Sequence, residues 1–341
     1  MLRGRTIVIT GASAGVGRAT ALCLARAGAD LALIARGADA LNEVKREAEC
    51  LGSRAMAIPA DVADADAVSR AAEAVATAYG GIDVWINNAM VTVFSPVWRM
   101  TPEEFRRVTE VTYLGVVHGT MAALRHMRPQ NRGTIINVGS ALAYRAIPLQ
   151  SAYCGAKYAI RGFTDALRSE LIHARSGIAL TMIDLPAVNT PQFDWARSHM
   201  KNNPRPVPPV FQPEVVADII LRAVLHPKRE YWIGVSTIKV ILANMLLPAY
   251  LDRYLARNVF DQQETNVPLS PTRKDNLMEP VSGLHRTHGR FDNEAADSAL
   301  TVLGAPTRFG PVFAAALGGI AACWLVMHRR RTPPRRANRS R

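Results

Sequence analysis

The 341-residue sequence lacks several features that define whole classes of protein. It contains only four cysteines, none in a CxxC or other metal-ligand spacing: Cys23, Cys50, Cys154 and Cys323. We therefore expect neither a disulfide framework nor a metal site, and we expect a reducing compartment. The first ten residues run directly into an apolar, β-rich segment, without the long apolar core and cleavage site of a secretory signal peptide. Export is accordingly not expected.

Acidic residues are also scarce. The chain has 28 Asp and Glu against 41 Lys and Arg, a net charge of +13, and seven arginines fall within the acid-free segment 328–341. That segment carries more than half of the excess charge, so the rest of the chain is only moderately basic. Aromatic residues make up 6% of the chain and do not alternate with basic ones as in proteins that stack bases. Nucleic acid is therefore not an expected partner.

Apolar residues are plentiful, at 49% of the chain, and their arrangement predicts the fold. From residue 5 to about 235, short apolar runs alternate with longer helical stretches; the runs are RTIVIT, LALIA, RAMAIP, IDVWIN, GTIINV, IALTMI and EYWIGV. Runs that are apolar throughout indicate parallel strands covered on both faces. The prediction is an α/β fold: a doubly wound, mostly parallel, Rossmann-like sheet with helices on both faces.

The pattern divides the chain into a dinucleotide-binding catalytic domain, residues 1–257, and a carboxyl-terminal extension. Residues 236–256 read as an amphipathic helix interrupted by Pro248. It either packs over a substrate pocket, which we favour, or lies against a membrane. Residues 258–308 have little periodicity and several Pro, Gly and Asn residues, which indicates a linker or loosely ordered extension.

Residues 309–327 contain nineteen residues without a charge and precede the Arg-rich tail, 328–341. As a helix they would span about 28 Å, close to the thickness of a hydrocarbon core. The sequence predicts a hydrophobic helix that spans the membrane or lies in its interface, while a buried or dimer-forming helix remains the alternative. We expect membrane association with the catalytic domain on the cytoplasmic side. Positive segments also favour that side, so either the short tail is forced across the membrane or the helix lies in or re-enters the interface while the arginines bind anionic headgroups.

A glycine-rich segment, TGASAGVGRAT, follows the first predicted strand and opens a helical stretch. Gly11, Gly15 and Gly17 have the spacing G-x-x-x-G-x-G. Glycine permits a tight turn and lets the backbone approach a pyrophosphate, whose charge is stabilised at a helix N-terminus. The segment predicts a dinucleotide site, in which Ser13 and Val16 are further candidate contacts.

Basic residues indicate which dinucleotide is bound. Many dinucleotide folds end the second strand with an acid that binds the adenosine ribose of NAD, but here Ala35 and Arg36 stand in that region. Arg18 directly follows the last glycine. Two guanidinium groups could bind a 2′-phosphate, which predicts NADP(H); two solvated arginines are the alternative.

The stretch SAYCGAKY places Tyr153 four residues before Lys157. At that spacing both side chains lie on one helix face and can address one point in space. A phenol beside an ammonium group can supply or accept a proton, although the same spacing also occurs between ordinary neighbours on a solvated helix.

Taken together, these motifs resemble the short-chain dehydrogenase/reductase family in its common form of about 250 residues, over residues 4 to 235. The motifs are TGASAGVG, the pair Asp61–Val62, NNAM from Asn87, NVGS ending at Ser140, and YCGAK from Tyr153. The resemblance implies that Asp61 and Val62 lie beside the adenine. It also implies that Asn87, Asn88 and Ala89 stabilise the sheet and line the cofactor, while Val188 and Thr190 border the nicotinamide.

The resemblance makes Ser140, Tyr153 and Lys157 one catalytic group. Ser140 would donate a hydrogen bond to the reacting oxygen and Tyr153 would act as the acid or base. Lys157 would favour the phenolate, lowering the pKa of Tyr153, and would grip the nicotinamide ribose. One departure concerns the run VTYLG, in which Thr112 replaces a family asparagine that helps to hold a relay water. The relay could be rebuilt, slowed or lost.

The functional hypothesis is an NADP(H)-dependent oxidoreductase that transfers hydride between the nicotinamide and an apolar carbonyl or alcohol. Phe193, Trp195 and Phe211 lie in a Pro-rich segment that suits a lid over an apolar pocket, or simple packing. The alternative is a cofactor-binding scaffold or redox sensor with weak or no turnover because of Thr112. The resemblance also implies a homo-oligomer.

Overall fold

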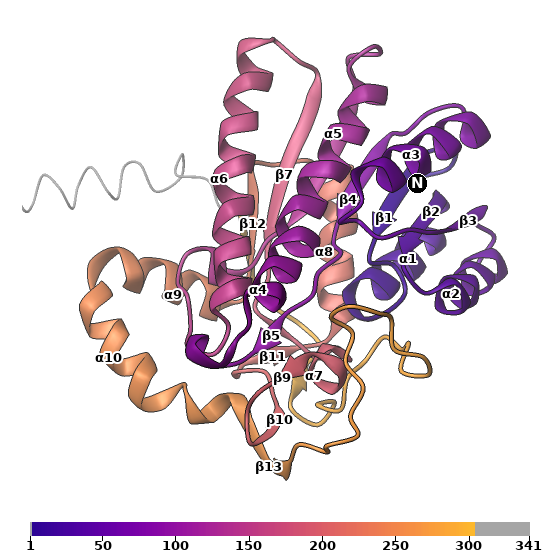
Figure 1. Ribbon diagram of the computed structural model, residues 1–341. Coiled ribbons are helices and arrows are strands. Elements are labelled where there is room, and N and C mark those ends of the chain that lie inside the picture. The colour runs from indigo at the N-terminus through magenta and orange to yellow at the C-terminus, as the bar shows by residue number, and fades with distance from the viewer. Residues whose placement is uncertain (1, 304–341) are drawn as a thin grey trace, which may run out of the picture. The chain divides into compact units, whose positions relative to one another are not determined.

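An eight-stranded sheet forms the centre of the structure, a computed structural model that describes residues 2–303 (Figure 1). The strand order is β15-β12-β7-β6-β4-β1-β2-β3, and all neighbours are parallel except β15, which runs antiparallel to β12. The bounds are β1 Thr6–Thr10, β2 Asp30–Ala35, β3 Ala55–Pro59, β4 Val84–Asn87, β6 Gly133–Val138, β7 Ile178–Asp184, β12 Glu230–Ile233 and β15 Thr301–Leu303. Each apolar run predicted as a strand is therefore a strand of this sheet.

The strands are mostly apolar because helices cover both faces of the sheet. In β1, Ile7 and Ile9 belong to one buried cluster and Val8 to another, as the alternation of side chains along a strand requires. The first cluster packs against α1 Gly15–Arg26, α2 Ala38–Cys50 and α8 Pro213–Leu225. The second packs against α3 Ala65–Tyr79, α4 Pro102–Thr109, α5 Gly115–Met127 and α6 Ser151–His173. The doubly wound α/β fold is confirmed.

Three small sheets and several short helical turns lie outside the central sheet. The sheets are β10–β13, β14–β11–β8 and β5–β9. Their strands are β5 Val93–Phe94, β8 Ala187–Val188, β9 Arg197–Ser198, β10 Asn202–Pro204, β11 Val210–Phe211, β13 Glu264–Pro268 and β14 Ala295–Ala296, and α7 spans Gln192–Trp195. The turns are Val97–Arg99, Ala141–Ala143 and Asp261–Gln263, and a π-helical segment, Glu110–Leu114, joins α4 to α5.

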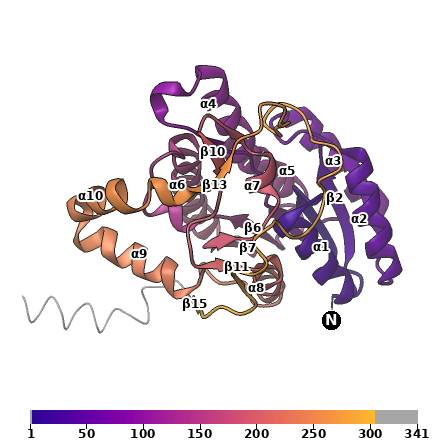
Figure 2. The same cartoon turned by 90° about the horizontal axis from the view of Figure 1, so that it is seen from below.

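The predicted amphipathic helix is two helices, α9 Val235–Leu246 and α10 Pro248–Asn258. Pro248 is the first residue of α10, a position at which its missing N–H costs no helical hydrogen bond. Both views place α9 and α10 at the side of the molecule opposite α2 and α3 (Figure 1, Figure 2).

Residues 258–303, part of the stretch 258–308 predicted as a linker or loosely ordered extension, contain three short strands, β13, β14 and β15. β13 pairs with β10, and β15 extends the central sheet. The structure groups the chain through Leu303 into one compact unit. Backbone pairing holds this segment in place, together with hydrogen bonds from side chains of residues 2–257 to its carbonyl oxygens. Neither kind of contact requires a periodic pattern of apolar residues.

The predicted helix at 309–327 and the tail at 328–341 lie outside the described residues. Within residues 2–303, no helix combines the length and the apolar character needed to cross a bilayer.

Candidate functional site

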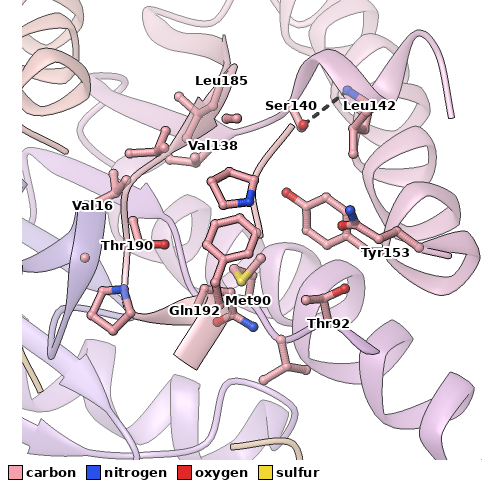
Figure 3. A pocket seen from close by; sticks show the side chains of 18 of the residues that line it. Val16, Met90, Thr92, Val138, Ser140, Leu142, Tyr153, Leu185, Thr190 and Gln192 are labelled. Carbon is pink, nitrogen blue, oxygen red and sulfur yellow. Dashed lines mark hydrogen bonds between the residues drawn. The ribbon is translucent and has the colours of Figure 1, made fainter. Parts of the chain in front are cut away.

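A cavity of about 550 Å³ opens at the carboxyl ends of the parallel strands. One part lies against the loop between β1 and α1, and another against β6, α6 and the α9–α10 pair. In open parallel sheets, ligands bind at this edge, at the point where the connections from two neighbouring strands run to opposite faces of the sheet. Figure 3 shows Val16 and Thr190 on one side of the cavity and Ser140 and Tyr153 on another.

The glycine loop can accept a dinucleotide pyrophosphate because its backbone leaves no room for side chains. Gly11 has φ +67°, and a Cβ atom there would lie 2.7 Å from the Ala89 Cα. A Cβ on Gly17 would lie 2.0 Å from the Gly11 carbonyl oxygen. Ser13 and Val16 line the cavity beside them, at the N-terminus of α1. The residues present therefore fit the predicted cofactor.

The asparagine motif at the end of β4 fixes the strands that carry this loop. The Asn88 amide donates to the Thr10 and Gly11 carbonyl oxygens at 3.0 and 3.2 Å. The Asn87 amide donates to Asn137 Oδ1 at 2.9 Å, which ties β4 to β6. The Ala89 N–H donates to Thr10 Oγ1 at 3.1 Å. These contacts have the sheet-stabilising character that the motif implied.

The two candidate arginines have different surroundings. Arg36 lines the cavity together with Asp61 and Val62. Arg18 does not line it; its guanidinium pairs with Glu43 at 2.6 Å and with Glu47, and donates to the His285 carbonyl oxygen at 2.6 Å. Of these two arginines, Arg36 reaches the cavity wall and Arg18 does not.

Residues 276–289, which we call the arm, cover this end of the cavity. Arg36 donates to the carbonyl oxygens of Asn276, Leu277 and Met278. Arg107, which pairs with Asp61, also donates to the Leu277 carbonyl oxygen, at 3.2 Å. Among the cavity-lining residues of the arm are Pro280, Val281 and His285. Sequence reasoning missed the arm because its contacts run through backbone atoms and follow no motif.

The predicted catalytic residues converge at the other end. Ser140 follows β6, and its Oγ accepts a hydrogen bond from the Leu142 N–H at 3.1 Å. Tyr153 and Lys157 lie one turn apart on α6, with the Lys157 Nζ 5.5 Å from the centre of the Tyr153 ring. The Lys157 Nζ donates to the Val138 carbonyl oxygen at 2.6 Å. The serine and the tyrosine line the cavity, and the lysine is buried behind them.

Burial controls the protonation of this group. It raises the pKa of Tyr153 above that of a free phenol, and the facing Ser140 side chain opposes the rise. Burial lowers the pKa of Lys157 to about 8, and the charge of Asp184 opposes that shift. The first direction is the reverse of the sequence expectation, because desolvation disfavours the phenolate more than the surrounding groups favour it.

Thr112 lies in the π-helical segment and is completely buried. Its Oγ1 accepts a hydrogen bond from the Val91 N–H at 3.1 Å, and the hydroxyl donates to the Val91 carbonyl oxygen at 2.8 Å. The hydroxyl is therefore committed to the backbone beside the cavity.

The remaining predicted residues form the apolar part of the cavity wall. Val188, Thr190, Phe193 and Trp195 line it, whereas Phe211 is buried in β11 and does not. Residues of α9 and α10 complete this wall, as expected from the preferred interpretation in which residues 236–256 pack over a substrate pocket. They are Ser236, Thr237, Val240, Leu251, Tyr254 and Leu255.

The chain is similar to known oxidoreductases. The profile of the short chain dehydrogenase family matches residues 5–201, more than half of the chain. The uncharacterized oxidoreductase YxnA of Bacillus subtilis is 34% identical over 286 residues, which cover 83% of this chain and 80% of YxnA. A fatty acyl-CoA reductase of Acinetobacter baylyi is 31% identical over 231 residues, covering 67% of this chain and 76% of that protein.

The crystal structure of a metagenomic short-chain oxidoreductase in complex with NADP is similar at a TM-score of 0.58 and 26% identity. The match covers 67% of this chain and 96% of that one. With the glycine loop, the Asn motif and the Ser140–Tyr153–Lys157 group in place, the chain belongs to the short-chain dehydrogenase family and is an oxidoreductase of the kind that uses a nicotinamide cofactor.

Proposed function

We propose that the protein is an NADP(H)-dependent oxidoreductase that interconverts an apolar carbonyl compound and its alcohol. The observation that carries the proposal is the placement of Ser140 and Tyr153 on the same part of the cavity (Figure 3). The Lys157 Nζ lies 5.5 Å from the centre of the tyrosine ring. Bound NADP(H) supplies or accepts the hydride. The side chains of the protein manage the charge and the proton at the substrate oxygen.

In the direction of reduction, the carbonyl carbon gains hydride while its oxygen gains negative charge. Ser140 donates a hydrogen bond to that oxygen, and Tyr153 gives it the phenolic proton, which completes the alcohol. Lys157 stabilises the phenolate left on Tyr153 until a proton from solvent replaces it. The raised pKa of Tyr153 keeps the phenol protonated at neutral pH, as an acid must be.

Carbonyl reduction should fall as the pH rises through about 8. The pKa of Lys157 is lowered to about 8, so its ammonium charge is complete below that pH and is lost above it. The raised pKa of Tyr153 means that loss of the phenolic proton does not cause the fall. The measurement is kcat/KM for carbonyl reduction from pH 6 to about 9.5. Lys157→Arg should give a lower but flat profile, because a guanidinium stays charged; an equally steep fall in that variant would remove Lys157 from the explanation.

The preference for NADP(H) is supported by Arg36 at the adenosine end of the cavity and by the similar oxidoreductase whose structure contains NADP. An apolar substrate is supported by the aliphatic and aromatic side chains of α7, α9 and α10 in the cavity wall. The similar fatty acyl-CoA reductase suggests a chain-like apolar carbonyl compound within that class. NADPH consumption across a panel of carbonyl compounds of increasing chain length tests the proposal.

The proposal includes a homo-oligomer, to be tested by light scattering.

A cofactor-binding sensor with little turnover is the second candidate, because the Thr112 hydroxyl is committed to Val91 and cannot also take the place of the asparagine amide in a relay. We expect Thr112→Asn to lower the free energy of unfolding by about 1–3 kcal/mol without raising kcat, since it crowds a buried site and removes two hydrogen bonds. Urea unfolding and NADPH oxidation measure both effects, and Thr112→Ser, which keeps the hydroxyl, is the control. Turnover that appears only in the Asn variant would favour the sensor.

For the residues beyond Leu303 we propose membrane association, with the catalytic domain on the cytoplasmic side. The support is the uncharged stretch 309–327, followed by seven arginines. We expect the full-length protein to sediment with membranes and to resist high salt, because apolar burial is not screened as arginine–lipid attraction is. A chain ending near Ala305 should lose the salt-resistant attachment and still bind NADPH. Release of the full-length protein by salt alone would leave only an electrostatic attachment.

A further inference from the structure

We propose that the α9–α10 pair, residues 235–258, is a second membrane contact, one that lies on the surface of the bilayer and brings the substrate cavity to it. The pair exposes an unusual number of large apolar side chains. They are Val235, Leu242, Met245, Leu246, Leu247, Tyr250 and Tyr254. Met245 is 65% exposed, Leu246 75% and Leu247 58%. Met245, Leu246 and Leu247 are consecutive, and exposed apolar side chains grouped in this way mark a contact surface, unlike single exposed leucines.

Hydrogen bonds attach both helices to the rest of the protein, so poor attachment does not explain the exposure of their apolar side chains. The Arg145 guanidinium donates to Asn244 Oδ1 at 3.2 Å on α9 and pairs with Asp252 at 2.5 Å on α10. The Asn244 amide donates to the Tyr144 carbonyl oxygen at 2.9 Å. Polar contacts from the loop after β6 therefore hold both helices, and the apolar tip between them faces outward (Figure 2). No residue of α10 is fully buried.

The charges of the pair favour a lipid surface as the occupant. Asp252 is its only acid and is paired with Arg145. Lys239, Arg253 and Arg257 are exposed and leave the pair basic. Exposed leucines and tyrosines next to basic residues are typical of helices that lie in the interface and meet anionic headgroups. The chain also continues past Leu303 with the uncharged stretch 309–327 and an Arg-rich end, which suits the same surface.

The side chains of the pair that line the cavity indicate what the membrane contact is for. This step rests on the proposed function. Val240, Leu251 and Leu255 line the substrate end of the cavity, so the same two helices form the cavity wall and the exposed patch. An apolar carbonyl compound dissolved in the bilayer could then reach Tyr153 past α9 and α10 without crossing water. A water-soluble substrate would gain nothing from this arrangement.

Hydrogen exchange tests the contact without using activity. The full-length protein is exchanged alone and with vesicles of equal parts phosphatidylcholine and phosphatidylglycerol, and peptides from residues 235–258 are measured by mass spectrometry. We expect their exchange to slow about tenfold or more with vesicles, because the bound face excludes water and suppresses opening. Peptides around Ile172, which is exposed on α6, should not change.

A pair of matched variants separates this contact from the carboxyl-terminal one. Leu246→Ser with Leu247→Ser should abolish most of the protection by vesicles, whereas Ile172→Ser, at a position that is 71% exposed, should leave it intact. No protection by vesicles would overturn the proposal, and so would protection that the double variant retains. Protection that appears without vesicles and grows with protein concentration would assign the patch to a second copy of the chain instead. A protein that is protected but inactive with every carbonyl compound would refute the proposed function and keep the membrane contact.

Discussion

Replacing Tyr153 with phenylalanine should lower kcat/KM for carbonyl reduction by about a hundredfold to ten-thousandfold, the range that a positioned acid contributes. Phenylalanine keeps the ring that packs near the Lys157 Nζ and removes only the hydroxyl. We therefore expect unchanged NADPH affinity and an unchanged unfolding temperature. The measurement is NADPH oxidation at saturating cofactor, combined with cofactor titration by fluorescence.

Tyr158 provides the matched control, because it lies on the same helix but is exposed to solvent. Tyr158→Phe should retain full activity. If Tyr153→Phe also retained its turnover, the acid would be another group and the assignment of the catalytic residues would be wrong.

Replacing Arg36 with glutamine should have the second largest effect, and it should change two properties together. The guanidinium lies at the proposed 2′-phosphate site and donates to three carbonyl oxygens of the arm, Asn276, Leu277 and Met278. Hydrogen bonds from a charged donor contribute about 1.5–3 kcal/mol each. We expect the preference for NADPH over NADH to fall about tenfold or more, and amide exchange in residues 276–289 to accelerate.

Glutamine is a cleaner test than aspartate, whose carboxylate would repel the arm carbonyls as well as the phosphate. Arg46→Gln is the control, because Arg46 is an exposed arginine of α2 whose Nε donates only to the Asn42 carbonyl oxygen. If amide exchange in the arm accelerated while the cofactor preference stayed the same, Arg36 would hold the arm without binding the phosphate. If amide exchange in the arm did not change, these hydrogen bonds would not be what holds the arm.

The sheet could be predicted because the residues that specify each strand lie within one short stretch of sequence. In runs such as RTIVIT and GTIINV, apolar residues occur at positions that point to both faces of the strand. This pattern is typical of a strand that is covered on both faces. The glycine loop was equally readable, since Gly11 and Gly17 leave no space for a Cβ atom. Tyr153 and Lys157 share a helix turn, so their spacing alone placed them on one face.

The arm and β15 could not be predicted from pattern. Their contacts join backbone groups to residues far away in the chain, such as the Leu277 carbonyl oxygen to Arg107. Arg18 was assigned to the phosphate because it directly follows the last glycine of the loop, but its guanidinium pairs with Glu43 and Glu47 on another helix. Glu43 and Glu47 stand one turn apart on α2, and that spacing was the available signal for an arginine partner. The raised pKa of Tyr153 depends on burial by surrounding elements, which its neighbours in sequence do not reveal.

The most direct test of the central claim is transfer of deuterium from NADPH that carries deuterium at both hydrogen positions of the reactive carbon of the nicotinamide. The purified full-length protein is incubated with labelled NADPH and apolar carbonyl compounds, and the product alcohol is analysed by mass spectrometry. The account predicts one deuterium in each alcohol formed, with equal loss of NADPH, and labelled alcohol that forms about a hundredfold or more slowly with Tyr153→Phe. Tight binding of NADPH without any labelled alcohol across the panel would contradict it.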